Sequence, residues 1–158
     1  MRLPIEPVPR GAWGKNLRNV APAHWPEIRG AVLGAAENRC AVCGAGGGPL
    51  ECDEVWAYDD AERVGTLVGL RALCESCHGV KHFLRSVTLA QQGRMSRSDL
   101  EALVVHALAV NGCTRAEFVA HNRQAQATWK ERGRHGWRVS FGEYAHHLSA
   151  RRPPGKAR

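Results

Sequence analysis

The chain has 158 residues, of which 44% are hydrophobic and 23% are charged, and its formal net charge is +7 at pH 7. This composition fits one compact domain with extra arms and excludes a wholly disordered chain. It contains no run of eighteen apolar residues and no early apolar stretch of signal-peptide length. We therefore expect a cytoplasmic protein without a membrane partner, and the positive charge favours nucleic acid as the partner, DNA rather than RNA.

The first segment, residues 1–22, is rich in proline and shows little periodicity, which predicts an extended N-terminal arm laid across the domain surface. Trp13 is interpreted as the anchor of this arm, packed into the core. The alternative is an exposed indole that stacks on nucleic-acid bases. Apolar residues then recur at helical spacing from Trp25 to Ala36, which predicts a helix over residues 23–37 with Pro26 in its first turn.

Two cysteine pairs with CxxC spacing follow, Cys40 with Cys43 and Cys74 with Cys77. A two-residue gap lets both thiolates of a pair reach one ion, and two pairs complete a tetrahedron around Zn²⁺. Because cytoplasmic thiols stay reduced, structural zinc is favoured over disulfides. The other two cysteines, Cys52 and Cys113, are interpreted as small buried residues.

Between the cysteine pairs, a glycine-rich turn at residues 44–49 precedes two apolar segments, 50–58 and 63–73, which predict a hairpin or two loosely paired strands. A helix is expected after Cys77 and should run to about residue 90, and His106 is interpreted as a hydrogen-bonded histidine of a later helix. Two capping-box patterns, Ser98 to Glu101 and Thr114 to Glu117, predict two further helices that end near Gly112 and Arg132. Residues 137–141 are expected to form a closing strand.

The region from Cys40 to His82 resembles the HNH endonuclease superfamily, also called the ββα-metal or treble-clef nucleases. The motifs that carry this resemblance are Glu51-Cys52-Asp53-Glu54-Val55-Trp56, Tyr58-Asp59-Asp60, Leu67-Val68-Gly69-Leu70-Arg71-Ala72-Leu73-Cys74 and Cys77-His78-Gly79-Val80-Lys81-His82. The resemblance implies an α+β fold with a small zinc-stabilised ββα-metal core, an N-terminal helix and additional C-terminal helices. Together with the patterns above, it divides the chain into the arm (1–22), the core (23–92), a helical extension of the same domain (93–141) and a basic flexible tail (142–158).

The same resemblance implies hydrolysis of phosphodiester bonds with a second divalent cation, which could be Mg²⁺, Mn²⁺, Ni²⁺ or Zn²⁺. Asp53 stands where the family has its general-base histidine, and aspartate is a poorer base for water at neutral pH. We expect Asp53, Glu54 and His78 to be catalytic, with Asp53, His78 and His82 as the ligands of the second ion. His78 and His82 are four residues apart, so one helix face could present both rings.

Two alternative functions remain open at this stage. A catalytically inactive protein could keep the zinc scaffold and bind nucleic acid, with Lys81, Arg85 and Arg71 on the phosphates. A repurposed metal site on the same fold could instead act on a small molecule, because a fold does not fix a reaction.

Overall fold

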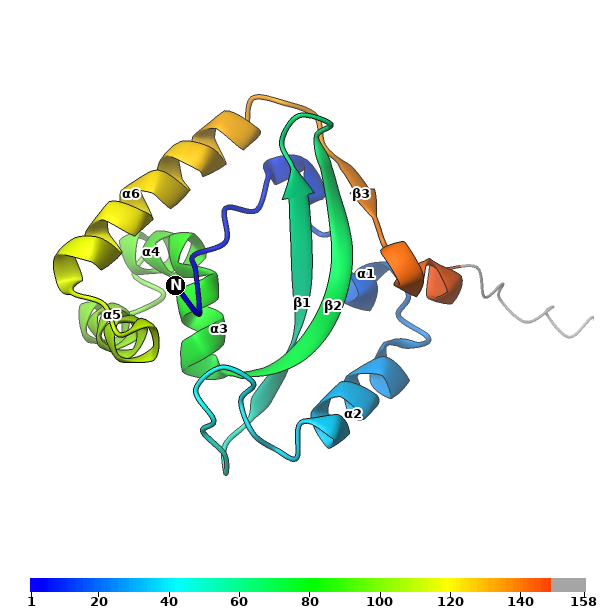
Figure 1. Cartoon of the computed structure of the whole chain (residues 1–158), viewed down its shortest axis with the longest axis horizontal. Helices are drawn as coiled ribbons and strands as arrows, with labels where there is room; N and C mark the ends of the chain where they lie inside the picture. Colours follow the sequence, from blue (N-terminus) through cyan, green and yellow to red (C-terminus); the bar gives the residue numbers. More distant parts are fainter. Residues whose placement is uncertain (149–158) are drawn as a thin grey trace, which may run out of the picture.

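The structure, a computed structural model that describes residues 1–148, has an α+β fold built around a long hairpin (Figure 1). Strand β1 (Leu50–Asp59) pairs antiparallel with β2 (Val64–Cys74), and their register shifts between Val55 and Trp56. The short strand β3 (Arg138–Ser140) pairs in parallel with the start of β2, which gives a three-stranded sheet in the order β1-β2-β3. The hairpin and the closing strand predicted from the sequence are therefore both present.

Helices lie on both sides of this hairpin. Figure 1 shows α3 to α6 together on one side, with α1, α2 and η2 on the other. The helical elements are η1 (Arg10–Ala12), α1 (Leu17–Val20), α2 (Trp25–Ala35), α3 (Glu75–Lys81), α4 (Phe83–Gln91), α5 (Arg97–Asn111), α6 (Arg115–Arg132) and η2 (Gly142–Leu148). None of the helices described is long and apolar enough to cross a membrane.

The helix expected from Cys77 to residue 90 is two helices, because the chain breaks at His82. Helix α3 ends at Lys81, His82 has φ −97° and ψ 35°, and α4 begins at Phe83. The break turns Phe83 into the core, where its ring meets Phe118 edge-on at 5.1 Å between centroids. Apolar periodicity continues through a one-residue break, so the sequence pattern could not reveal it.

Helix α5 also differs from its expected start. Its N-cap is Ser96, whose side chain forms a capping box with Asp99, two residues before the predicted box at Ser98. Both pairs match the pattern, and the earlier one extends the helix by half a turn. The second capping box, Thr114 with Glu117, and the left-handed cap at Gly112 are confirmed.

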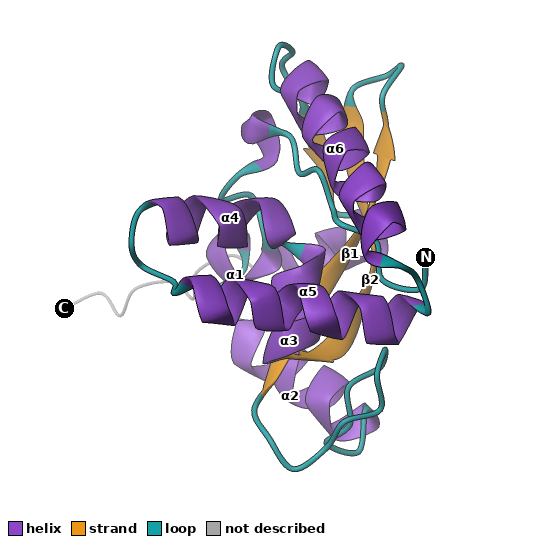
Figure 2. Cartoon of the chain, turned by 90° about the vertical axis from the view of Figure 1, so that its left-hand side faces the viewer, coloured by secondary structure: helices purple, strands orange, loops and turns teal. Residues whose placement is uncertain are grey.

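Helix α5 crosses close over α3, as Figure 2 shows. A Cβ added at Gly79 of α3 would lie 2.8 Å from Cδ2 of Leu103, so any larger residue there would force the Leu103 side chain to move. The core between these helices and the hairpin is made of Leu73, Val80 and Ala107 among other fully buried residues. Helix α3, which follows directly from β2, is thereby held against both β1 and α5.

The N-terminal arm is part of the core rather than a strap on the surface, contrary to the prediction. Leu3 and Ile5 are buried, and the backbone of Leu3 exchanges hydrogen bonds with the side-chain amide of Asn111. The Ile5 N–H donates to Nε2 of His121 at 2.9 Å. The predicted anchor is wrong, since the Trp13 residue is 58% exposed.

We expect the contact between the arm and His121 to make stability fall in mild acid. Burial, with the nearby terminal ammonium, lowers the pKa of His121 below its usual 6.5, and neutral Nε2 accepts the Ile5 N–H. This contribution is complete above the unfolded pKa and is lost as the pH falls through the lower folded pKa. Urea unfolding from about pH 7 to about pH 5 measures it. His121→Gln, which keeps an acceptor, should show a weaker pH dependence, and equal slopes in both proteins would contradict the prediction.

The C-terminal end of α6 is tied to the hairpin tip by Arg132. Its guanidinium pairs with both carboxylate oxygens of Asp60, at 2.7 and 2.8 Å, and lies over the rings of Tyr58 and Trp137. The chain continues from there into β3 and η2. The basic tail expected at residues 142–158 thus begins with a 3₁₀ helix, and the expectation for residues 149–158 lies outside the described residues.

Candidate metal centre

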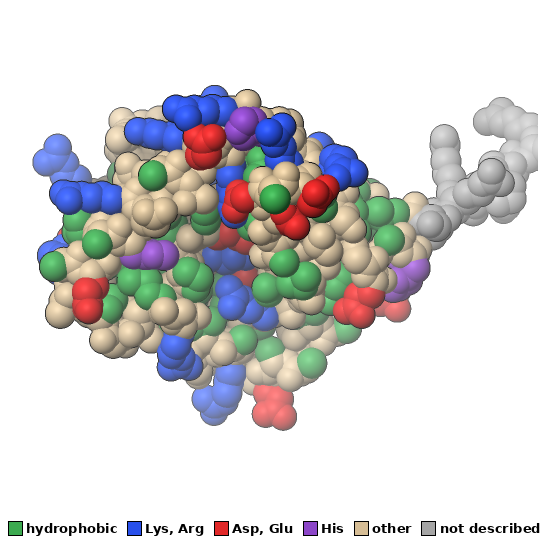
Figure 3. Space-filling view, turned by 45° about the horizontal axis from the view of Figure 1, so that its top comes forward, with side chains coloured by type: hydrophobic (Ala, Val, Ile, Leu, Met, Phe, Trp, Pro, Cys, Tyr) green, Lys and Arg blue, Asp and Glu red, His purple; other side chains and the backbone are tan. Residues whose placement is uncertain are grey.

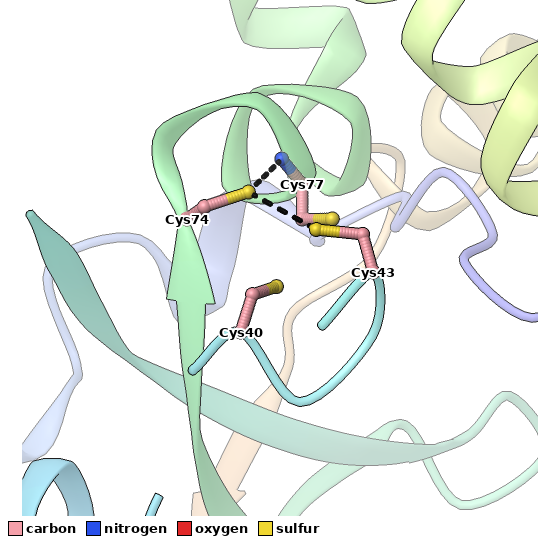
Figure 4. Close-up of side chains that lie close together, drawn as sticks. All are labelled: Cys40, Cys43, Cys74 and Cys77. Carbon is pink, nitrogen blue, oxygen red and sulfur yellow. Dashed lines mark hydrogen bonds between the residues drawn. The ribbon is translucent and has the colours of Figure 1, made fainter. Parts of the chain in front are cut away.

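The two CxxC pairs come together at the end of the hairpin, as predicted. Cys40 and Cys43 lie in the loop before β1, whereas Cys74 ends β2 and Cys77 lies in the first turn of α3 (Figure 4). All four sulfur atoms lie within 4.8 Å of one another, and Sγ of Cys43 is 3.6 Å from Sγ of Cys74. Tetrahedral zinc–sulfur bonds of about 2.3 Å would separate the sulfurs by about 3.8 Å, so the cluster fits a metal ion such as zinc.

The local backbone favours metal binding by these sulfurs. Burial alone would disfavour a thiolate at Cys40, but the backbone N–H groups of Cys43, Cys74 and Val42 outweigh it and lower the pKa of Cys40 to about 6. Burial and the neighbouring cysteines raise the pKa of Cys77, because negative charges that share a small space repel one another. A bound divalent cation offsets this repulsion and deprotonates its thiol ligands.

His106 lies beside the four-cysteine cluster, and the other two cysteines lie outside it. Nε2 of His106, on α5, lies 3.1 Å from Sγ of Cys77, so this ring is a hydrogen-bond partner of a candidate ligand. Such contacts orient metal ligands and disperse their charge. Cys52 and Cys113 are partly buried and lie outside the cluster.

A second cluster lies at the other end of α3. It joins Asp53 of β1 to His78 and His82, and each residue offers a ligand atom within 4.8 Å of the others. The two rings meet edge-on, with 4.7 Å between their centroids. Burial, assisted by the neighbouring His82, lowers the pKa of His78 to about 4, so its imidazole is neutral at pH 7 and able to bind a metal. Two histidines and one carboxylate are a common donor set for divalent transition metals.

Lys81 lies inside this second cluster instead of on the surface that was expected to meet phosphates. It is 5% exposed, and its ammonium lies 2.8 and 3.0 Å from the two carboxylate oxygens of Asp53. It also donates to the backbone carbonyl of Glu54. A buried ammonium needs such partners, because an unpaired charge in the interior costs several kcal/mol. Lys81 is therefore an internal counter-ion of Asp53 and not an exposed cation.

Asp53 is held firmly in its ionised form. Burial alone would raise its pKa, but the His82 ring, 3.7 Å from Oδ1, and the Lys81 ammonium outweigh burial and lower the pKa of Asp53 to about 2. The Nε of Arg71 adds a third contact at 3.1 Å to Oδ2. So acidic a carboxyl group is well suited to bind a cation and poorly suited to take a proton from water.

The structure adds Glu6, which the sequence analysis missed, to this cluster. Its carboxylate is 3.3 Å from Nζ of Lys81 and 3.9 Å from Nδ1 of His82. The backbone bond from the Glu6 N–H to the Lys81 carbonyl holds the arm in place at 2.8 Å. Burial raises the pKa of Glu6. The available sequence signal was weak: Glu6 is the one acidic residue before Glu27, and it stands between two prolines.

Glu54 lies outside this cluster, whereas Arg71, one of the two expected phosphate-binding arginines, contacts it through Asp53. Alternation along β1 directs Glu54 away from Asp53, and its carboxylate accepts the Leu17 N–H at 2.6 Å and the Trp56 indole N–H at 3.1 Å. Glu54 therefore positions α1. Arg85 is exposed on α4, and Arg71 is partly exposed beside Asp53.

The chain was compared with protein-family models, curated proteins and solved structures, and none of them matches it. Conclusions about function therefore depend on the two side-chain clusters themselves. One cluster can hold a metal ion between four sulfurs. The other presents two imidazoles and a carboxylate, close to the carboxylate of Glu6 and the ammonium of Lys81.

Proposed function

We propose that the chain is a metal-dependent phosphodiesterase of the HNH type that acts on nucleic acid. In this proposal Zn²⁺ in the four cysteines is structural, and a second divalent cation binds Asp53, His78 and His82. The observation that carries the proposal is the convergence of these three side chains from β1, α3 and the residue that ends α3. A divalent cation in such a site lowers the pKa of bound water and stabilises charge on a phosphate group.

The roles within the site follow from its electrostatics. Asp53 serves as a ligand and not as the general base, because its pKa is about 2. Glu54 serves the fold, since its carboxylate is engaged by Leu17 and Trp56. Arg85 and the partly exposed Arg71 are the cations that can meet the phosphates of a bound strand, while Lys81 keeps Asp53 and Glu6 in place.

The proposal predicts a second, exchangeable ion in addition to the structural zinc. After dialysis, a calorimetric titration with Mn²⁺ should show one further binding site per chain. His78→Gln and His82→Gln should weaken this site by at least about tenfold, because even the loss of a hydrogen-bond partner of a metal ligand costs about 10- to 100-fold in affinity. The native protein, incubated with plasmid DNA and Mn²⁺, Mg²⁺ or Ni²⁺, should produce strand breaks in the plasmid. Both variants should produce fewer breaks.

A matched control is His135→Gln, at the end of α6, where the ring pairs with Glu131 away from the cluster. It should leave both the second ion and the strand breaks unchanged. A native protein that binds one zinc and no Mn²⁺ at millimolar concentration, and that leaves plasmid intact, would contradict the proposal.

A second candidate is a zinc-stabilised protein that binds nucleic acid without cleaving it. The observation that favours it is Lys81, whose ammonium already supplies Asp53 and Glu6 with a cation. Lys81→Met separates the two candidates. In a non-hydrolytic protein this change should create Mn²⁺ affinity that the native chain lacks, whereas in an enzyme the native chain already binds the ion.

A further inference from the structure

Two tryptophans from distant parts of the chain stack on each other at the surface. Trp13 follows η1 and Trp129 lies near the end of α6, and their ring centroids are 6.5 Å apart with planes 19° from parallel. The guanidinium of Arg10 lies 5.0 Å from the centroid of Trp129. Trp13 nevertheless remains 58% exposed, so most of this large apolar residue faces solvent. We call Arg10, Trp13 and Trp129 the tryptophan platform.

The turn that carries Trp13 is fixed against the domain. A Cβ added at Gly11 would lie 3.1 Å from the backbone nitrogen of Trp137, so the turn packs backbone to backbone against the residue before β3. The indole N–H of Trp13 points to the Val8 carbonyl at 3.4 Å. The turn that presents the exposed ring is therefore packed in place before any ligand arrives, which reduces the entropic cost of binding.

The charges around the tryptophan platform suit a polyanion. Residues 7–26 contain Arg10, Lys15 and Arg18 and no acidic residue, and residues 118–130 contain Arg123 and Lys130 and no acidic residue. The end of α6 and the hairpin tip lie at the top of Figure 1, and Figure 3 turns this top forward and shows many Lys and Arg side chains there, with some acidic ones. Glu131, which follows Lys130, pairs with Arg134 and His135.

We propose that the tryptophan platform binds single-stranded nucleic acid by stacking an unpaired base on Trp13, while Arg10 and its basic neighbours contact the flanking phosphates. Exposed aromatic rings beside a positively charged surface bind single strands without strong sequence preference, because every base has a π face. A duplex offers no free base face and should bind the platform less well. This inference extends the proposed function to a strand-binding surface, but it requires neither a second metal ion nor hydrolysis.

The test is binding of a fluorescent thymidine oligonucleotide of about ten nucleotides, followed by anisotropy at low salt without added divalent cation. Trp13→Ala should weaken binding by about 5- to 150-fold, the range for loss of one base–aromatic stack. Trp13→Phe should retain part of the affinity because it keeps an aromatic face. Arg10→Gln should reduce the slope of log affinity against log salt by about 0.7, the value for one phosphate contact on a single strand.

Val105→Ala is the matched control, since Val105 is 56% exposed on α5 and should leave binding unchanged. Zinc content and thermal melting establish that each variant is folded. The inference is overturned if Trp13→Ala binds the oligonucleotide as tightly as the native chain, or if a duplex of the same length binds equally well and loses as much affinity in this variant. Loss of plasmid cleavage in the His78→Gln variant without loss of oligonucleotide binding would separate this surface from the proposed metal site.

Discussion

Replacing Cys77 by serine should abolish metal binding and unfold the protein near room temperature. Cys77 is fully buried, and its sulfur lies with those of Cys40, Cys43 and Cys74 where the hairpin, α3 and the first cysteine loop meet. Structural zinc in small domains contributes about 10–16 kcal/mol of apparent binding free energy. That is as large as the whole stability of a typical domain, about 5–15 kcal/mol, so the fold should not survive without the ion.

The measurements are metal content by mass spectrometry and thermal melting by circular dichroism, for the native chain, Cys77→Ser and the native chain after exhaustive chelation. The controls are Cys52→Ser and Cys113→Ser, because both cysteines lie outside the cluster. These two variants should keep one zinc per chain and a melting temperature close to that of the native protein. A native chain that carries no metal, or whose clustered thiols are joined in disulfides, would refute this account of the cluster.

Replacing Asp53 by asparagine should destabilise the protein by about 3 kcal/mol or more, although the neutral amide has almost the same volume as the carboxylate. The reason is Lys81, whose buried ammonium would lose its closest anionic partner, and removal of one partner of a buried ion pair costs about 3–5 kcal/mol. Glu6 remains 3.3 Å away and offsets part of this cost.

A double-mutant cycle measures the interaction directly. Asp53→Asn, Lys81→Met and the double variant should be unfolded with urea at a fixed free zinc concentration, because bound metal shifts the apparent stability. The double variant should be less destabilised than the sum of the single variants, with a coupling energy of about 0.5–3 kcal/mol. Glu101→Gln is a suitable control, because Glu101 pairs with Arg115 at an exposed site where ion pairs contribute little. Additive effects of Asp53 and Lys81 would show that the buried pair does not couple in solution.

The contribution of Asp53 to stability also determines which variants can test the proposed reaction. If Asp53→Asn unfolds the protein, a loss of strand cleavage in this variant says nothing about metal ligation. His78→Gln and His82→Gln are therefore the informative variants for activity, since these rings lie at the edge of the ion-pair network and not at its centre.

The sequence by itself determined the four-cysteine cluster and most of the secondary structure. Two CxxC pairs have few other uses among reduced thiols, and their spacing fixes which sulfurs can meet. The hairpin, α2, the capping box at Thr114 and the end of α5 at Gly112 followed from short-range signals that operate within a few residues. The gathering of Asp53, His78 and His82 was also expected, because the resemblance to the HNH superfamily implied a second ion at these residues.

Tertiary structure alone decided how the charged groups are paired. Lys81 was assigned to the surface and Glu6 to a peripheral arm. Lys81 is instead buried against Asp53, and the partly buried Glu6 lies beside it, because the arm enters the core through Leu3 and Ile5. Trp13 shows the reverse, since a residue expected in the core remains exposed on the surface. Contacts between residues far apart in the chain determine the burial of Lys81 and the exposure of Trp13. A single sequence carries no periodicity or spacing that would predict such contacts. The cost of burying a charge then determines which side chains must meet.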